Sequence, residues 1–188
     1  NCHVNVLQTN DILEFRSYAE ELKWLTTDPK RMNWVAQTIK DISTSGNTLI
    51  LVDRISAGEI LEKKIKDSVF IRGATKNTER KEHYDEVSTA QTKVIIATYG
   101  VAAVGINIPR IFNLVLIEPG KSFVRVIQSI GRGIRKAEDK ESVSIWDITS
   151  ACKFARRHLT QRKKFYKEAN YPYNIEKIDT DLYENTNT

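Results

Sequence analysis

The amino-acid sequence predicts an α/β fold in which helices flank a parallel β-sheet, with an N-terminal helical lead-in and a C-terminal basic helix. Three observations predict this class. Short and almost wholly apolar runs such as Thr48–Asp53 are typical of strands that are covered on both faces. These runs alternate with longer amphipathic stretches, as in a parallel sheet. The 188 residues, 40% of them hydrophobic, suffice for one compact domain with a core.

The first part of the chain, residues 1–46, is predicted as a lead-in segment that packs on the core. Asp28 followed by Pro29 is typical of a helix start, with Asp as the N-cap and Pro at the first helical position. The predicted elements are a strand at His3–Thr9, a short helix at Tyr18–Leu25 and a second helix from Pro29 to near Ser45-Gly46.

Residues 47–170 are predicted as the main domain. Its strands are expected at Thr48–Asp53, Ser68–Arg72, Lys93–Thr98, Asn113–Glu118 and Val143–Ile148. Its helices are expected at Ser56–Lys66, Asn77–Val87, Ser122–Arg135 and, strongly basic, from about Ser150 to Ala169. Residues 171–188 are predicted as a polar tail that is frayed from Asp179 onward.

Ligands of such sheets bind where the strands end, so the residues after each strand are candidates for a site. They are Asp53-Arg54, Arg72-Gly73-Ala74-Thr75, Thr98-Tyr99-Gly100, Glu118-Pro119-Gly120-Lys121 and Asp147. This set is rich in glycine, hydroxyl groups and charge. Loops of that composition can bring backbone N–H groups up to phosphates.

The strongest pattern lies in the helix predicted at Ser122–Arg135. Gln128, Arg132 and Arg135 fall within an arc of roughly 60° on a helix, beside Gly131, which would let another surface approach closely. The apolar residues fall on a different face: Phe123, Ile127, Ile130 and Ile134. Two arginines alone could simply favour the negative C-terminal end of the helix. The complete Q-x-x-G-R-x-x-R pattern, on an α/β domain, is much harder to explain in this way.

A second pattern spans Ile96–Pro109, where Ala97-Thr98 ends a strand and Gly105-Ile106-Asn107-Ile108-Pro109 follows. By itself this glycine and proline could be ordinary loop punctuation. Taken together, the two patterns resemble motifs V and VI of superfamily 2 helicases, which would make the fold RecA-like. The segments around Arg54 and around Gly73–Thr75 with Arg80 resemble motifs IV and IVa, and the four occur in the family's order.

The resemblance implies roles for individual residues. Arg132, Arg135 and Gln128 would contact the γ-phosphate of an ATP, which with its Mg²⁺ is held mainly by a first RecA-like domain of the same polypeptide. The nucleotide side of the cleft would include Gly105, Asn107 and Gly131, although many relatives carry Asp where this chain has Asn107. The nucleic-acid contacts would come from Arg54, Gly73, Thr75, Thr98, Tyr99 and Lys121.

Within the superfamily, the chain resembles phage helicases of recombination and repair. The stretches that carry this resemblance are Tyr18–Lys23, Lys30–Val35, Tyr99–Val101 and Trp146-Asp147. The resemblance implies DNA as the partner, branched or single-stranded, and the cytoplasm of a phage-infected bacterial cell as the setting. The isolated chain is expected to lack ATPase activity because no Walker A loop and no D-E-x-[DH] box are present.

Two rival functions remain open at this stage. An ATP-independent nucleic-acid-binding or annealing module is favoured by the charge distribution, since Lys121–Glu168 holds 13 Lys and Arg against 5 Asp and Glu. The basic helix near Ser150–Ala169 could equally contact DNA or only present a solvated face. A small P-loop kinase or GTPase would use Gly120-Lys121-Ser122, but the first glycine that this loop needs is replaced by Val115, inside a strand.

The remaining composition excludes several classes of protein. No apolar run is long enough for a membrane span, and no signal segment opens the sequence. Cys2 and Cys152 form no CxxC pair and have no clustered histidines, so we expect no metal site and a reducing compartment.

Overall fold

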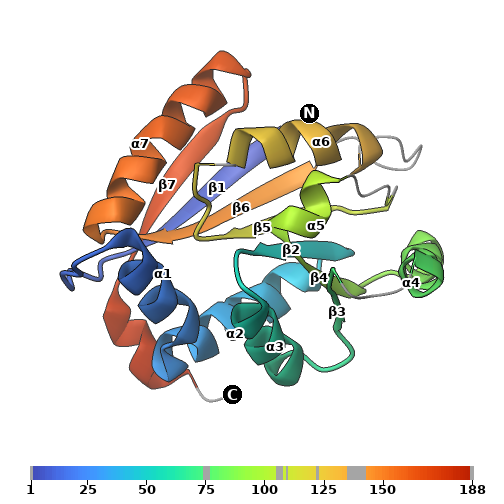
Figure 1. Ribbon diagram of the computed structural model, residues 1–188, viewed down its shortest axis with the longest axis horizontal. Coiled ribbons are helices and arrows are strands. Elements are labelled where there is room, and N and C mark those ends of the chain that lie inside the picture. Colours follow the sequence, from blue (N-terminus) through green and yellow to red (C-terminus); the bar gives the residue numbers. More distant parts are fainter. Residues whose placement is uncertain are drawn as a thin grey trace.

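A computed structural model describes residues 2–73, 77–104, 108, 110–121, 123–134 and 143–186, with only the backbone given for helical residues 77, 78, 84, 88, 89 and 130–134. In this part of the chain, seven strands form one parallel sheet of order β3-β4-β2-β5-β6-β1-β7 (Figure 1). The strands are β1 Cys2–Thr9, β2 Thr48–Val52, β3 Val69–Ile71, β4 Val94–Thr98, β5 Asn113–Ile117, β6 Val143–Ser150 and β7 Tyr173–Ile178. The predicted parallel α/β fold is confirmed.

The helices lie on both sides of this sheet (Figure 1). They are α1 Tyr18–Thr27, α2 Pro29–Ser43, α3 Ile55–Lys64, α4 Asn77–Thr89, α5 Tyr99–Ala103, α6 Phe123–Ile134, α7 Lys153–Glu168 and the 3-10 helix η1 Thr180–Asn185. Helices α2 and α3 cover one face, whereas α5, α6 and α7 cover the other. Because successive side chains of a strand point to opposite faces, Leu49 and Leu51 of β2 join one core cluster and Ile50 and Val52 join the other.

The lead-in is part of the same sheet. Strand β1 lies between β6 and β7, with Val4 opposite both Ile145 and Tyr173. Helix α2 begins as predicted, because the Asp28 carboxylate accepts a hydrogen bond from the Arg31 backbone N–H and Pro29 opens the first turn. Residues 1–46 therefore contribute a strand to the core.

The predicted polar tail is wrong for most of its length. Residues Tyr173–Ile178 form β7, an edge strand whose alternating half-buried and exposed side chains leave one side polar. Beyond it, η1 buries Tyr183, whose hydroxyl donates to the Asp11 carboxylate at 3.0 Å. The Tyr183–Asp11 hydrogen bond and the pairing of β7 with β1 hold this segment against the domain, although its composition is polar.

Two smaller differences affect the site. The expected loop after Thr98 begins with the short helix α5, and Asp147 lies inside β6 instead of after it. Among the described residues, no helix is long and apolar enough to cross a membrane.

Candidate functional site

The carboxyl ends of β2, β3, β4 and β5 meet at one edge of the sheet because the four strands are parallel neighbours. The structure thereby brings together Arg54, Gly73, Thr98 and Lys121, which the sequence places far apart. The Arg54 guanidinium is partly exposed and lies 3.9 Å from the neighbouring Asp53 carboxylate. This edge carries the features that the sequence predicts for nucleic-acid contact.

Thr98 and Tyr99 differ in what they can offer at this edge. The Thr98 hydroxyl oxygen accepts from the Val101 backbone N–H at 3.2 Å and so caps α5, while its own O–H can still donate. The Tyr99 hydroxyl donates to the Ile117 carbonyl at 3.0 Å inside the protein, and burial raises its pKa well above the usual 10. The Tyr99 hydroxyl therefore ties α5 to β5, and the contact of Tyr99 with nucleic acid stays a prediction.

The loop after β3 is held open by Arg80. The Arg80 guanidinium donates to the carbonyl oxygens of Arg72 at 2.9 Å and Gly73 at 3.2 Å. A Cβ added at Gly73 would meet nothing within 4 Å, so this position faces open space. Thr75 lies outside the described residues. The part of this loop that is described can therefore receive a ligand at Gly73.

Helices α5 and α6 lie side by side, which brings the second and first sequence patterns together. The Ser129 hydroxyl of α6 donates to the Ala103 carbonyl of α5 at 3.3 Å. Gln128 is exposed beside this contact, and Val104, which follows α5, is 79% exposed. Three predicted residues lie outside the described residues: Gly105, Asn107 and Arg135. For Gly131 and Arg132 the structure describes the helical backbone.

The backbone position of Arg132 follows from the direction of α6. Helix α6 leaves that edge after Lys121 and returns to the opposite edge, because it connects the parallel strands β5 and β6. At 1.5 Å per residue, the backbone of Arg132 is about 14 Å from the first residue of α6. The backbone at Arg132 therefore lies at a distance from the edge that holds Thr98.

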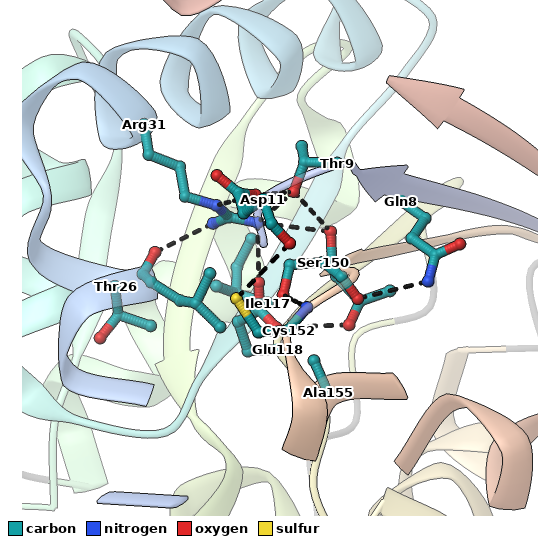
Figure 2. A network of polar contacts seen from close by, with 12 residues as sticks. Gln8, Thr9, Asp11, Thr26, Arg31, Ile117, Glu118, Ser150, Cys152 and Ala155 are labelled. Atoms are coloured by element: carbon teal, nitrogen blue, oxygen red, sulfur yellow. Dashed lines mark hydrogen bonds and ion pairs between the residues drawn. The ribbon is translucent and has the colours of Figure 1, made fainter. Parts of the chain in front are cut away.

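A buried ion network supports the loop between β5 and α6, and sequence reasoning missed it (Figure 2). Arg31 of α2 is fully buried, and its guanidinium donates to Glu118 at 2.8 Å and to the Leu25 carbonyl at 2.9 Å. The Asp11 carboxylate lies 3.8 Å from the same guanidinium. The available signals were a glutamate directly after an apolar strand and an arginine on the apolar side of an amphipathic helix.

Glu118 occupies an unusual backbone and electrostatic position. Its φ of 45° lies in the left-handed region, which the surrounding hydrogen bonds must stabilise. Burial raises the pKa of its carboxyl to about 7, an effect that Arg31 and Arg162 oppose. The loop therefore begins at a residue whose charge depends on Arg31.

A second network holds the same loop from the other face of the sheet. The buried Arg162 of α7 makes two hydrogen bonds to Asp147, at 2.8 and 3.0 Å, and a third to the Pro119 carbonyl at 2.8 Å. The Tyr166 hydroxyl donates to Asp147 at 2.7 Å. Arg162 is thus structural, while other cations of α7 are exposed: Lys153, Arg156, Arg157, Lys164 and Lys167.

The geometry of Glu118–Lys121, the described part of this loop, does not fit a phosphate-binding loop, and Ser122 lies outside the described residues. Five residues separate β5 from α6, and both Glu118 and Pro119 are bound to buried arginines. A Cβ at Gly120 would lie 2.7 Å from the Tyr18 hydroxyl, so the backbone here backs onto α1 instead of facing an empty cradle. These residues do not fit Mg²⁺-ATP, and the self-sufficient P-loop enzyme is excluded on this geometry.

The sheet order, the paired helices α5 and α6 and the loop-rich edge define a helicase-type RecA-like domain. A family model described as helicase conserved C-terminal domain matches residues 30–137, more than half of the chain, and the chain belongs to this family. The chain is 28% identical over 158 residues to the ATP-dependent DNA helicase uvsW of Enterobacteria phage T4. The aligned region covers 81% of this chain and 32% of the phage protein.

Solved structures agree with the family. The crystal structure of T4 UvsW matches 95% of this chain and 42% of its own, with a TM-score of 0.83 at 21% identity. The C-terminal domain of the DEAD-box protein Dbp5 matches 98% of this chain and 95% of its own, with a TM-score of 0.60. The chain spans about a third of the length of the T4 helicase that it matches.

Proposed function

We propose that the chain is the second motor domain of an ATP-dependent superfamily 2 DNA helicase or translocase that acts on branched DNA in recombination or repair. The observation that carries this proposal is the pairing of α5 with α6 through Ser129 and Ala103. Further along α6, the backbone of Arg132 lies at a distance from the edge that holds Thr98. One surface can then face a nucleotide while the other holds a strand. The T4 relative is a phage protein, so the proposed setting is a phage-infected cell.

On the first surface, Arg132 and Arg135 would act as arginine fingers, and Gln128 would contact the γ-phosphate beside them. Their guanidiniums would stabilise the charge that develops on the transferred phosphoryl group. Gly105, Asn107 and Gly131 would approach the same nucleotide. ATP and Mg²⁺ would be held mainly by the first RecA-like domain, which supplies the Walker A loop and acidic box absent from these 188 residues.

On the second surface, the backbone of a DNA strand would lie along Arg54, the Gly73–Thr75 loop, Thr98 and Lys121. Two observations support this path. The Gly73 backbone faces open space, and the O–H of Thr98, which caps α5, can donate to a phosphate oxygen. Closure of the two domains on ATP and their opening after hydrolysis would shift this surface along the strand.

The test uses a polypeptide that carries both motor domains. Arg132→Ala or Arg135→Ala should abolish ATP turnover and spare DNA affinity, whereas Thr98→Val should weaken the stimulation of ATPase by DNA. Preserved turnover in the arginine variants would reject the finger assignment, and an unaltered response to DNA would reject the role of Thr98.

A second candidate is the ATP-independent nucleic-acid-binding or annealing module. The exposed cations of α7, among them Lys153 and Arg156, favour it because a basic helix face binds polyanions without a nucleotide. The two functions differ in one measurement. Annealing that proceeds at the same rate with and without ATP, and no DNA-stimulated turnover in the two-domain polypeptide, would favour the second candidate.

A further inference from the structure

A cavity of about 620 Å³ opens at the carboxyl edge of the sheet, beside the proposed strand path. It lies where β2 and β5 are neighbours and their following helices, α3 and α6, pass to opposite faces of the sheet. Such switch points form crevices that bind ligands in parallel α/β sheets. The volume falls within the range of small-molecule and nucleotide sites. The cavity shares Tyr99 with the second sequence pattern and Lys121 with the proposed strand path, whereas its lining residues from α1 and α7 lie outside the four motifs.

The walls of the cavity are aromatic. Tyr18 comes from α1, whereas Phe154 and His158 come from the first two turns of α7. The rings of Tyr18 and His158 are 4.9 Å apart edge to face, and the rings of Tyr18 and Phe154 are 6.2 Å apart. The half-buried rings of Tyr18 and Phe154 and the buried ring of His158 thus line a single opening. Nucleic-acid bases stack on aromatic surfaces of this kind, and all four bases can do so.

The rim of the cavity is cationic on one side. Lys121 and Arg157 are exposed there, and the Arg157 guanidinium lies 5.8 Å above the Phe154 ring. A guanidinium plane offers a stacking surface for a base as well as a charge for a phosphate. Asp53 also lines the cavity, and its carboxylate would accept hydrogen bonds from the amino or imino groups of a base.

Two further features fit a neutral aromatic ligand. Burial, together with Arg162 and Lys121, lowers the pKa of His158, so this ring is uncharged near neutral pH and can stack or share a hydrogen bond. The floor is rigid, because the Gly120 backbone lies directly against the Tyr18 hydroxyl and the loop is bound by Arg31 and Arg162. Because the cavity is preformed, few side chains lose conformational freedom when a ligand binds in it.

We propose that this cavity holds one unstacked base of the DNA strand whose backbone passes along Thr98 and Lys121. The proposal rests on the proposed function, because it needs a strand at this edge. The base would stack among Tyr18, Phe154 and Arg157, and its phosphate would lie on the Lys121 side, away from Asp53. The chain would therefore bind single strands partly through a base, in addition to the sequence-independent contacts to phosphates.

The test compares two single strands of equal length and charge, an oligothymidylate and a fully abasic strand. Fluorescence anisotropy with the 188-residue chain should give about tenfold tighter binding of the thymidylate, as one stacked base contributes. Phe154→Ala should remove this preference and leave the affinity for the abasic strand unchanged. Phe15→Ala is the matched control, because Phe15 packs on Trp24 outside the cavity and should preserve the preference.

A second pair of variants separates charge from folding effects. Arg157→Gln should weaken thymidylate binding several-fold more than Arg156→Gln, since Arg156 lies next to it on α7 but lines a different groove. If Phe154→Ala lowers the melting temperature, Tyr18→Leu replaces it as the aromatic variant. Free thymidine monophosphate should bind more weakly than the strand, because it lacks the neighbouring phosphates.

The outcomes distinguish this inference from the proposed function. Equal, salt-dependent binding of both strands by the unaltered chain would overturn the base site and leave the strand path intact. A failure to bind either strand would overturn both. Free nucleotide binding as tight as strand binding would also overturn the inference, because the cavity would then be a nucleotide site.

Discussion

Replacing Arg31 by Met tests the buried network under the loop between β5 and α6. The side chain is fully buried and serves two carboxylates, Glu118 at 2.8 Å and Asp11 at 3.8 Å. Methionine preserves much of the volume but removes the charge, so both carboxylates lose their buried cation. Removing one partner of a buried ion pair costs about 3–5 kcal/mol, which lowers the melting temperature of a chain of this length by roughly 6–20 °C.

The loss should depend on pH because Glu118 can take up a proton. Its pKa is about 7 in the folded protein and near the ordinary 4.5 in the unfolded chain. The folded state therefore binds the proton more readily between these values, and this group contributes less stability as the pH rises through that window. Without Arg31 the folded pKa rises further. The variant should then lose less stability at pH 6, where Glu118 is neutral, than at pH 9.

Circular dichroism melts and urea titrations at pH 6 and pH 9 measure both effects. Arg156→Met, an exposed arginine on α7, is the matched control and should change stability by less than about 0.5 kcal/mol. Adding Glu118→Gln to Arg31→Met should recover about 1–3 kcal/mol at pH 9, because a neutral amide needs no cation. A loss below about 1 kcal/mol that is equal at both pH values would refute the reasoning.

Three further variants test other contacts. Glu21→Gln should lower the free energy of unfolding by about 1–2 kcal/mol, since the buried carboxylate accepts two backbone N–H bonds at the start of α7; urea titration showing no change would contradict this. Tyr166→Phe should cost about 1.5–3 kcal/mol by removing the hydroxyl that donates to Asp147, and an unshifted thermal midpoint would speak against it. Gly58→Ala should cost about 1–3 kcal/mol, because its Cβ would lie 2.3 Å from the Phe70 ring; Phe70→Leu in the same chain should restore part of the loss, and no such recovery is the opposing result.

Much of the fold could be predicted from hydrophobic period and caps. The strand Thr48–Val52 has its side chains buried on both faces, and Asp28-Pro29 opens α2 as expected. These are local properties, because a strand covered on both sides needs a continuous apolar run and a helix start needs an N-cap acceptor. The segment Tyr173–Ile178 escaped prediction because an edge strand with one polar side has a weak apolar pattern.

The candidate site divides in the same way. Helix periodicity and strand ends predicted which elements hold Gln128, Arg132 and Thr98, while the roles of these residues stay predictions that rest on the family resemblance. The buried partners Arg31 and Arg162 were not found, since each is paired with a carboxylate more than a dozen residues away. The position of Arg31 on the apolar side of its helix was a local signal, but it does not identify the distant carboxylate that pairs with the arginine.

By itself, the sequence determined the class of fold, the order of the helicase motifs and the lack of a phosphate-binding loop, all of which depend on residues close together in the chain. Only the tertiary structure decided that the backbone of α6 runs away from the strand ends, that the loop at Glu118 is bound from both faces, and that α1 and α7 enclose an aromatic cavity. The physical reason is that these features depend on the direction in which helices cross the sheet and on long-range pairing of buried charges, which local periodicity does not encode.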